Sequence, residues 1–168
     1  MNPQLLMDGL VSGSMIGLGA IGVTLTYSIL RFPNFAHGEF IAWGAYLAMT
    51  LSAVIGAAVG ASTAPLGPFS FGWSLPVAGL LAMILTAGLA LVLDRILFKR
   101  LRNQGAVMII IVMASFGASM ALRSALEFIY TARPGYFTRE LQIAIPLGGG
   151  IRATPDQLFA IGLTVVLV

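Results

Sequence analysis

Three polar side chains, Asn34, His37 and Glu39, lie within six residues of each other in a chain where only 9% of residues are charged. His37 is the single histidine. An ionisable side chain inside a membrane is costly, which makes His37 a candidate for a functional role. A structural role is equally consistent with the pattern, because Asn34 and neutral His37 can bond to loose backbone groups at a broken helix. The sequence leaves both interpretations open.

These residues do not form an enzyme constellation. His37 and Glu39 are two positions apart, so on a helix they point to different faces and cannot form a compact metal pair. There is no second histidine and no cysteine, and the nucleophile-elbow, zinc-protease and phosphate-loop motifs are absent from the sequence. We therefore expect no enzymatic activity, no cofactor and no metal site.

The local sequence predicts that these polar residues sit at a break between two helices. Pro33 disfavours helical backbone at Phe32, so the first helix should stop near Arg31. Asn34 is then placed as an N-cap, with its side-chain oxygen accepting an N–H from Ala36 or His37. Glu39 follows near the start of the next helix, where the helix dipole favours an anion.

The flanking segments have the composition of membrane spans. Hydrophobic residues make up 58% of the 168 positions, and the mean hydropathy is +0.97. Residues 9–30 and 40–93 contain no charged side chain, and a helix needs about 20 apolar residues to cross a bilayer. We predict an all-α, polytopic transmembrane bundle that forms a single domain over 1–168, with a break after the first span. Its spans should cover residues 5–30, 40–60, 75–93, 105–122 and 155–168.

Small residues recur at a spacing of four in the first two spans. Such ladders let helix backbones approach closely, because lipid gives two helices no hydrophobic reason to pair. The alternative is that glycine is simply common in membrane helices. The positions predicted to pack are Gly9, Gly13, Gly17, Gly44, Ala48, Ser52 and Gly56.

Charge placement predicts the topology. The segment 94–102, interpreted as a loop, holds four basic residues and lies on the same side as Arg31. A polar stretch at 123–154 lies on the other side and also holds four. The short basic segment is the better positive-inside signal, so it should be cytoplasmic and the N-terminus outside. Within the longer stretch, Arg123 and Glu127 form an i, i+4 pair that we interpret as a solvated surface pair.

The segment Gly9–Tyr46 (GLVSGSMIGLGAIGVTLTYSILRFPNFAHGEFIAWGAY) resembles the N-terminal region of branched-chain amino acid ABC transporter permeases. The likeness is greatest to the LivH type, with a glycine-rich first helix, NFAHG at 34–38, an acidic residue at Glu39, and GAY at 44–46. The segment IRATPDQL at 151–158 resembles the family just before its fifth span.

The resemblance implies a multi-pass subunit of a bacterial inner-membrane importer that works by alternating access. It implies a second related permease, two cytoplasmic ATP-binding subunits, an extracytoplasmic binding protein and an amino acid substrate, with the lipid bilayer as surroundings and no nucleic acid. Asn34, His37, Gly38 and Glu39 are the predicted path residues at the helix break. Alternatives are the same architecture with urea or short amides as cargo, or a structural helical membrane protein without transport.

The last apolar run stops 12 residues after Asp156, which is short for a span. We therefore expect a fragment of a longer permease, and the resemblance implies that the loop that docks on the ATPase lies beyond the fifth span.

Overall fold

The computed structural model describes residues 3–59, 72–130, 144–148 and 151–167. Four of its helical segments are long and apolar enough to cross a membrane: Gln4–Leu30, His37–Ala58, Ser74–Asn103 and Met108–Tyr130. A shorter apolar helix, α6 (Pro155–Leu167), follows. The predicted all-α, multi-pass class is confirmed. Clustered glycine and proline at residues 61–74 predict a turn-rich connection before the third span, and this stretch lies, through residue 71, outside the described residues.

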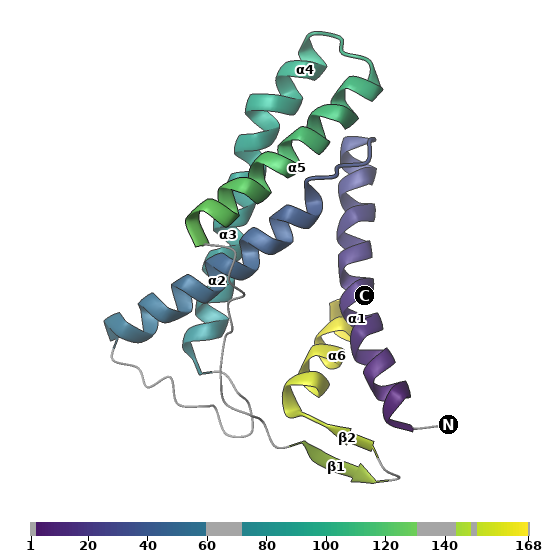
Figure 1. Cartoon of the computed structure of the whole chain (residues 1–168), viewed down its shortest axis with the longest axis vertical. Coiled ribbons are helices and arrows are strands. Elements are labelled where there is room, and N and C mark those ends of the chain that lie inside the picture. The colour runs from purple at the N-terminus through teal and green to yellow at the C-terminus, as the bar shows by residue number, and fades with distance from the viewer. Residues whose placement is uncertain (1–2, 60–71, 131–143, 149–150, 168) are drawn as a thin grey trace.

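Helix α1 (Pro3–Leu30) and helix α2 (His37–Val59) are separated by the predicted break. Helix α2 begins about three residues earlier than the sequence suggested, because His37 already takes part in the first turn. Helix α3 (Ser74–Leu93) packs along α2, and α5 (Met108–Tyr130) contacts α2 as well. Helix α1 stands beside this group and packs chiefly against α6 (Figure 1).

The expectation of a loop at residues 94–102 is wrong. Helix α3 continues through a π-helical turn, η1 (Asp94–Phe98), into α4 (Lys99–Asn103). The segment holds Arg, Lys and Leu, which favour helix, and no glycine or proline interrupts it. The helix ends at Asn103, and Gly105 just beyond it has a φ of 69°, which suits a left-handed residue after a helix terminus.

The stretch that begins at Arg123 is also more ordered than predicted. Helix α5 continues past Leu122 to Tyr130, because Ala125, Leu126 and Glu127 favour helix as strongly as the residues before them. The sequence Arg-Pro-Gly at 133–135 predicts a turn, and these residues lie outside the described part of the chain. Strands β1 (Ile145–Gly148) and β2 (Ile151–Ala153) then form an antiparallel hairpin, with Ile145 opposite Ala153 and an irregular register between Pro146 and Gly148.

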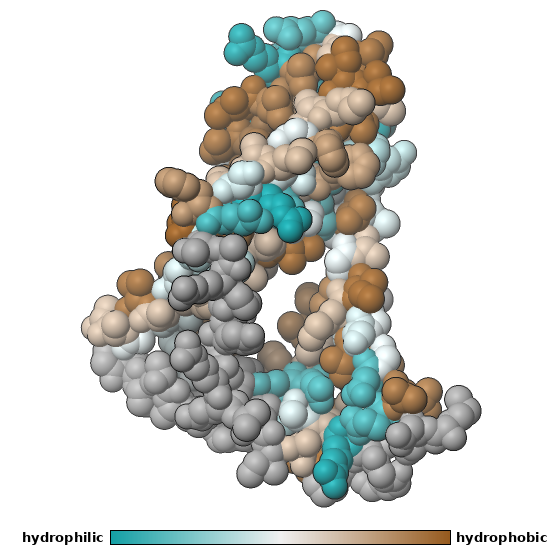
Figure 2. Space-filling model, viewed as in Figure 1, coloured by the Kyte–Doolittle hydropathy of each residue, from teal (hydrophilic) through white to brown (hydrophobic). Residues whose placement is uncertain are grey.

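Buried side chains are scarce and concentrated near the helix break. Phe32, Phe98 and Ile111 form a cluster that brings together the break, η1 and α5. Most large apolar side chains on the described helices are exposed, as expected for surfaces that face lipid tails. In Figure 2 polar residues gather over the α4 end and around the hairpin, and apolar residues cover most of the surface between them.

Candidate translocation site at the helix break

The break between α1 and α2 has a defined backbone. Arg31 has a φ of 58°, and its N–H donates to the carbonyl of Tyr27 at 2.8 Å. A left-handed residue at this position ends a helix, although glycine is the usual choice. A side chain there costs about 1–2 kcal/mol, so the rest of the break must hold the chain in place.

Asn34 supplies part of that support. Its side-chain oxygen accepts the Ala36 N–H at 3.1 Å, and its carbonyl accepts the His37 N–H at 3.2 Å. The predicted hydrogen bond from the Ala36 N–H to the Asn34 side chain is confirmed, but Asn34 is not itself the N-cap, because α2 begins at His37 and the Ala36 carbonyl accepts its first bond, from Phe40. Asn34 therefore accepts one N–H just before α2 and one at its first residue.

Contacts with α5 and η1 anchor the break to the bundle. The ring of Phe32 lies 5.3 Å, centroid to centroid, from that of Phe98. The Ser115 hydroxyl, which is fully buried, accepts the Phe35 N–H at 3.3 Å and donates to the Val112 carbonyl at 2.7 Å. The break is thus held by the ring contact between Phe32 and Phe98 and by the hydrogen bonds of the Ser115 hydroxyl.

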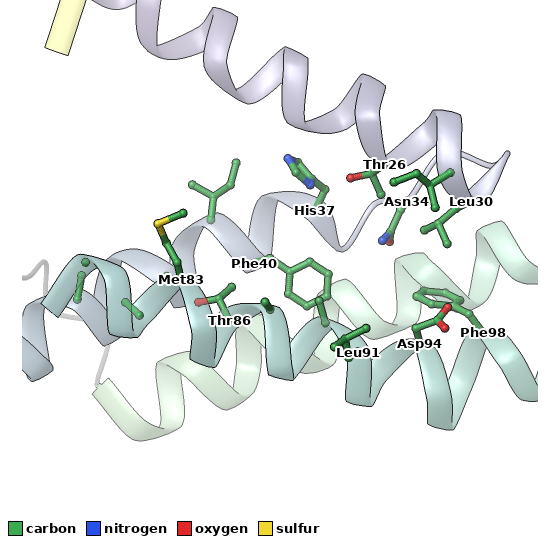
Figure 3. A pocket seen from close by; sticks show the side chains of 18 residues that line it. Thr26, Leu30, Asn34, His37, Phe40, Met83, Thr86, Leu91, Asp94 and Phe98 are labelled. Carbon is green, nitrogen blue, oxygen red and sulfur yellow. The ribbon is translucent and has the colours of Figure 1, made fainter. Parts of the chain in front are cut away.

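A cavity of about 920 Å³ adjoins the break. Its wall is formed by the end of α1, the first half of α2, and one face of α3 and η1, as Figure 3 shows. Most of the wall is apolar. The polar residues that line it are Thr26, Asn34, Thr86, Asp94 and His37.

Most of the polar groups in the wall are already engaged. The Thr26 hydroxyl donates to the Gly22 carbonyl at 2.8 Å, and Asp94 pairs with Arg102 at 2.8 Å. The His37 ring lies so close to Gly22 that a β-carbon there would be 2.8 Å from Nε2. His37 therefore reaches from the start of α2 to the backbone of α1, across the edge of the cavity.

The predicted path residues divide into two pairs. Asn34 and His37 line the cavity, whereas Gly38 and Glu39 belong to the same turn but are not part of the described wall. Glu39 is half-buried in the first turn of α2, where its charge suits the helix dipole. Their role in transport stays a prediction.

The small-residue ladders differ from each other. A β-carbon added at Gly44 would lie 3.4 Å from the Thr86 hydroxyl, and Ala48 lines the cavity, so this part of the α2 ladder faces α3. Ser52 donates to the Met49 carbonyl of its own helix, and Gly56 is half-buried. On α1 no described atom lies within 4 Å of a β-carbon built at Gly9, Gly13 or Gly17. Close packing of these three glycines, against a helix from another chain or segment, stays a prediction.

Sequence reasoning missed several residues of the site. Ser115 carried only a small-residue signal, and nothing distinguished Thr86 within its apolar run. Phe98 lies in a basic segment that was interpreted as a loop, so its burial was not predicted. Across the described residues no group of three or more His, Cys, Asp or Glu side chains could hold a metal ion.

A family model described as branched-chain amino acid transport system, permease component, matches residues 5–167. The chain belongs to this permease family. BraD of Pseudomonas aeruginosa, a high-affinity branched-chain amino acid transport system permease protein, is 31% identical over 142 residues, 80% of this chain and 43% of BraD. LivH of Escherichia coli K12, which has the same description, is 29% identical over 122 residues, 72% of this chain and 36% of LivH.

This chain therefore spans less than half the length of these relatives. No solved structure matches it.

Proposed function

We propose that this chain is part of the membrane-spanning permease of an ATP-driven importer of branched-chain amino acids, and that the cavity beside the helix break belongs to its translocation path. The observation that carries the proposal is the cavity itself, which opens between three apolar helices in a chain of this permease family. A wall with many aliphatic and few polar groups suits a small molecule with a branched aliphatic side chain.

The break is the part of the path that moves. The break joins two helices that are each long enough to cross the membrane, so residues 31–36 connect two spans and do not interrupt a single one. Asn34 and His37 place their side chains at this connection and in the cavity wall at once. Gly38 and Glu39 continue the same turn and complete the proposed path segment.

The partners are those that the family resemblance implies. They are a second related permease, two cytoplasmic ATP-binding subunits and an extracytoplasmic binding protein, assembled in the bacterial inner membrane. The positively charged end of α4 lies at the same end of the molecule as the α1–α2 connection, and the hairpin lies at the other (Figure 1). This arrangement supports a cytoplasmic position for α4 and an outside position for the N-terminus.

The nature of the wall favours this cargo over the alternatives. Urea has no apolar part and short amides have only a short alkyl group, so either would leave most of an apolar wall without contacts. A purely structural membrane protein has no need for a cavity of about 920 Å³. The family and the relatives support transport of branched-chain amino acids.

Uptake of labelled leucine by the permease in its complete complex tests the proposal. His37→Leu should reduce uptake strongly, whereas His37→Gln, which keeps a donor and an acceptor, should be milder. Asn34→Leu, which removes the acceptor of the Ala36 N–H, should impair uptake more than Phe35→Leu, the matched control at the neighbouring exposed position. Immunoblots establish equal expression. Wild-type uptake by His37→Leu would show that the break is only scaffolding.

A further inference from the structure

The net positive charge of the chain is concentrated in two short segments. The whole sequence has nine basic and six acidic residues. Segments 31–39 and 94–102 together hold five of the basic residues and two of the acidic ones. The rest of the sequence carries four of each sign, so the net charge of +3 belongs to these two segments alone.

The fold brings the two segments together at the edge of the apolar region. The rings of Phe32 and Phe98 lie 5.3 Å apart, centroid to centroid, and Leu30 and Leu93 pack against the same cluster. Leu30 and Leu93 are also the last residues of two long charge-free runs. Because both runs end at this cluster, the boundary between lipid tails and headgroups lies at its level.

Most of the basic side chains at this level are exposed and have no acidic partner. Asp94 is already paired with Arg102 at 2.8 Å, and Glu39 is half-buried in the first turn of α2. The exposed basic residues that form no ion pair with the described residues are Arg31, Arg95, Lys99 and Arg100. We call these four residues the basic surface. In Figure 2 it belongs to the polar end of the molecule around α4.

The spacing of these cations matches the depth of a headgroup layer. Arg95 and Lys99 are four residues apart, about 6 Å along a helix axis, and the polar layer on each side of a bilayer is about 5–8 Å thick. The exposed side chains of Leu91 and Ile96 face the tails beside them. Long basic side chains can lie along such apolar surface while their charged ends reach the phosphates.

We propose that the basic surface binds the headgroups of anionic phospholipids in the leaflet on the α4 side. Basic residues next to a span attract a negatively charged membrane surface, and a guanidinium group can hold a phosphate through two parallel hydrogen bonds. A zwitterionic headgroup carries its own cation, which offsets this attraction. An acidic protein surface would meet the tip of α4 first, whereas Arg31 and Arg95 lie at the tail boundary.

The test measures which lipids the protein retains. The complete transporter is incorporated into vesicles of equal parts phosphatidylglycerol, which is anionic, and phosphatidylcholine, which is zwitterionic. It is then extracted in detergent with its bound lipids, and mass spectrometry gives the ratio of the two. The variant Arg95→Gln with Lys99→Gln removes two cations of the basic surface. The matched control, Arg123→Gln with Arg152→Gln, removes two exposed cations elsewhere.

The wild type should retain phosphatidylglycerol in excess. Arg95→Gln with Lys99→Gln should lower the ratio of phosphatidylglycerol to phosphatidylcholine at least about fivefold, since one cation near an anionic surface already corresponds to about that factor in affinity. The matched control should keep the wild-type ratio. Arg95→Lys with Lys99→Arg, which keeps both charges, should keep it as well. High salt should lower the wild-type ratio, because exposed charges are screened.

Equal lipid ratios in the wild type and in Arg95→Gln with Lys99→Gln would overturn the proposal, and so would an equal fall in the matched control. Loss of the ATP-binding subunits from this variant with an unchanged lipid ratio would also overturn it, because the basic surface would then dock a protein. The lipid ratio does not depend on leucine transport. Absence of leucine uptake would therefore refute the proposed function without affecting this inference.

Discussion

The contact between His37 and Gly22 is open to a direct test. A β-carbon at Gly22 would lie 2.8 Å from His37 Nε2 and 2.9 Å from Cε1. Ordinary contact begins at 3.4 Å, so in Gly22→Ala the ring must retreat by about 0.6 Å, the difference between 3.4 and 2.8. We expect this substitution to disturb the fit between α1 and the start of α2.

The expected magnitude follows from opposing effects. A histidine has only two side-chain torsions, and turning the ring off its preferred rotamer costs about 0.5–1.5 kcal/mol. Replacing glycine by alanine in a helix gains roughly 0.5–1 kcal/mol. Gly22→Ala should therefore be nearly neutral. Gly19→Ala, on the same helix with no described atom within 4 Å of its added β-carbon, should gain the full helix contribution.

The measurement is the unfolding free energy of the purified permease in detergent, with leucine uptake in parallel. Gly22→Ala should be less stable than Gly19→Ala by about 0.5–1.5 kcal/mol. Combining each with His37→Ala should abolish that difference, since the ring is gone. Equal stabilities of the two single variants would show that the ring does not depend on the space at Gly22.

Two further predictions concern the ends of the molecule. Cysteines introduced as Asn103→Cys and Gly149→Cys should react with an impermeant reagent from opposite sides of the membrane in intact cells, and labelling of both from one side would refute the topology. Thr154→Ala should lower the free energy of unfolding by about 1 kcal/mol. The Thr154 hydroxyl accepts the Gln157 N–H and the Gln157 side chain accepts the Thr154 N–H at the start of α6. An unchanged free energy of unfolding would show that Thr154 does not cap this helix.

The sequence was sufficient for features that depend on local chemistry. Pro33 and Asn34 predicted the break and the hydrogen bond from the Ala36 N–H to Asn34, because a proline restricts the residue before it and an asparagine side chain bonds to nearby backbone. The apolar runs predicted the spans because their length matches the bilayer. The i, i+4 spacing predicted the Arg123–Glu127 pair, which is observed at 3.2 Å and is exposed.

Features that depend on partners far along the chain were not predictable in this way. The bond from Phe35 to Ser115 joins residues 80 positions apart, and no local pattern specifies it. Thr86 is one hydroxyl in an apolar helix, and its burial depends on where α2 passes. The basic segment after Leu93 was misassigned because charge was taken as a sign of a loop, although Lys and Arg are good helix formers.

The continuous helix from Ser74 to Asn103 has a consequence for depth in the bilayer. Its 30 residues extend about 45 Å, whereas the hydrocarbon layer is about 30 Å thick. When the helix stands near the membrane normal, about 15 Å extends beyond the lipid tails. That is the length of the ten residues from Asp94 to Asn103. Sliding the helix inward by one turn would carry Asp94 and Arg95 among the tails, and sliding it outward would expose apolar residues to water. The charged end therefore restricts movement of the helix along the membrane normal and so fixes the depth of the cavity relative to the membrane surface.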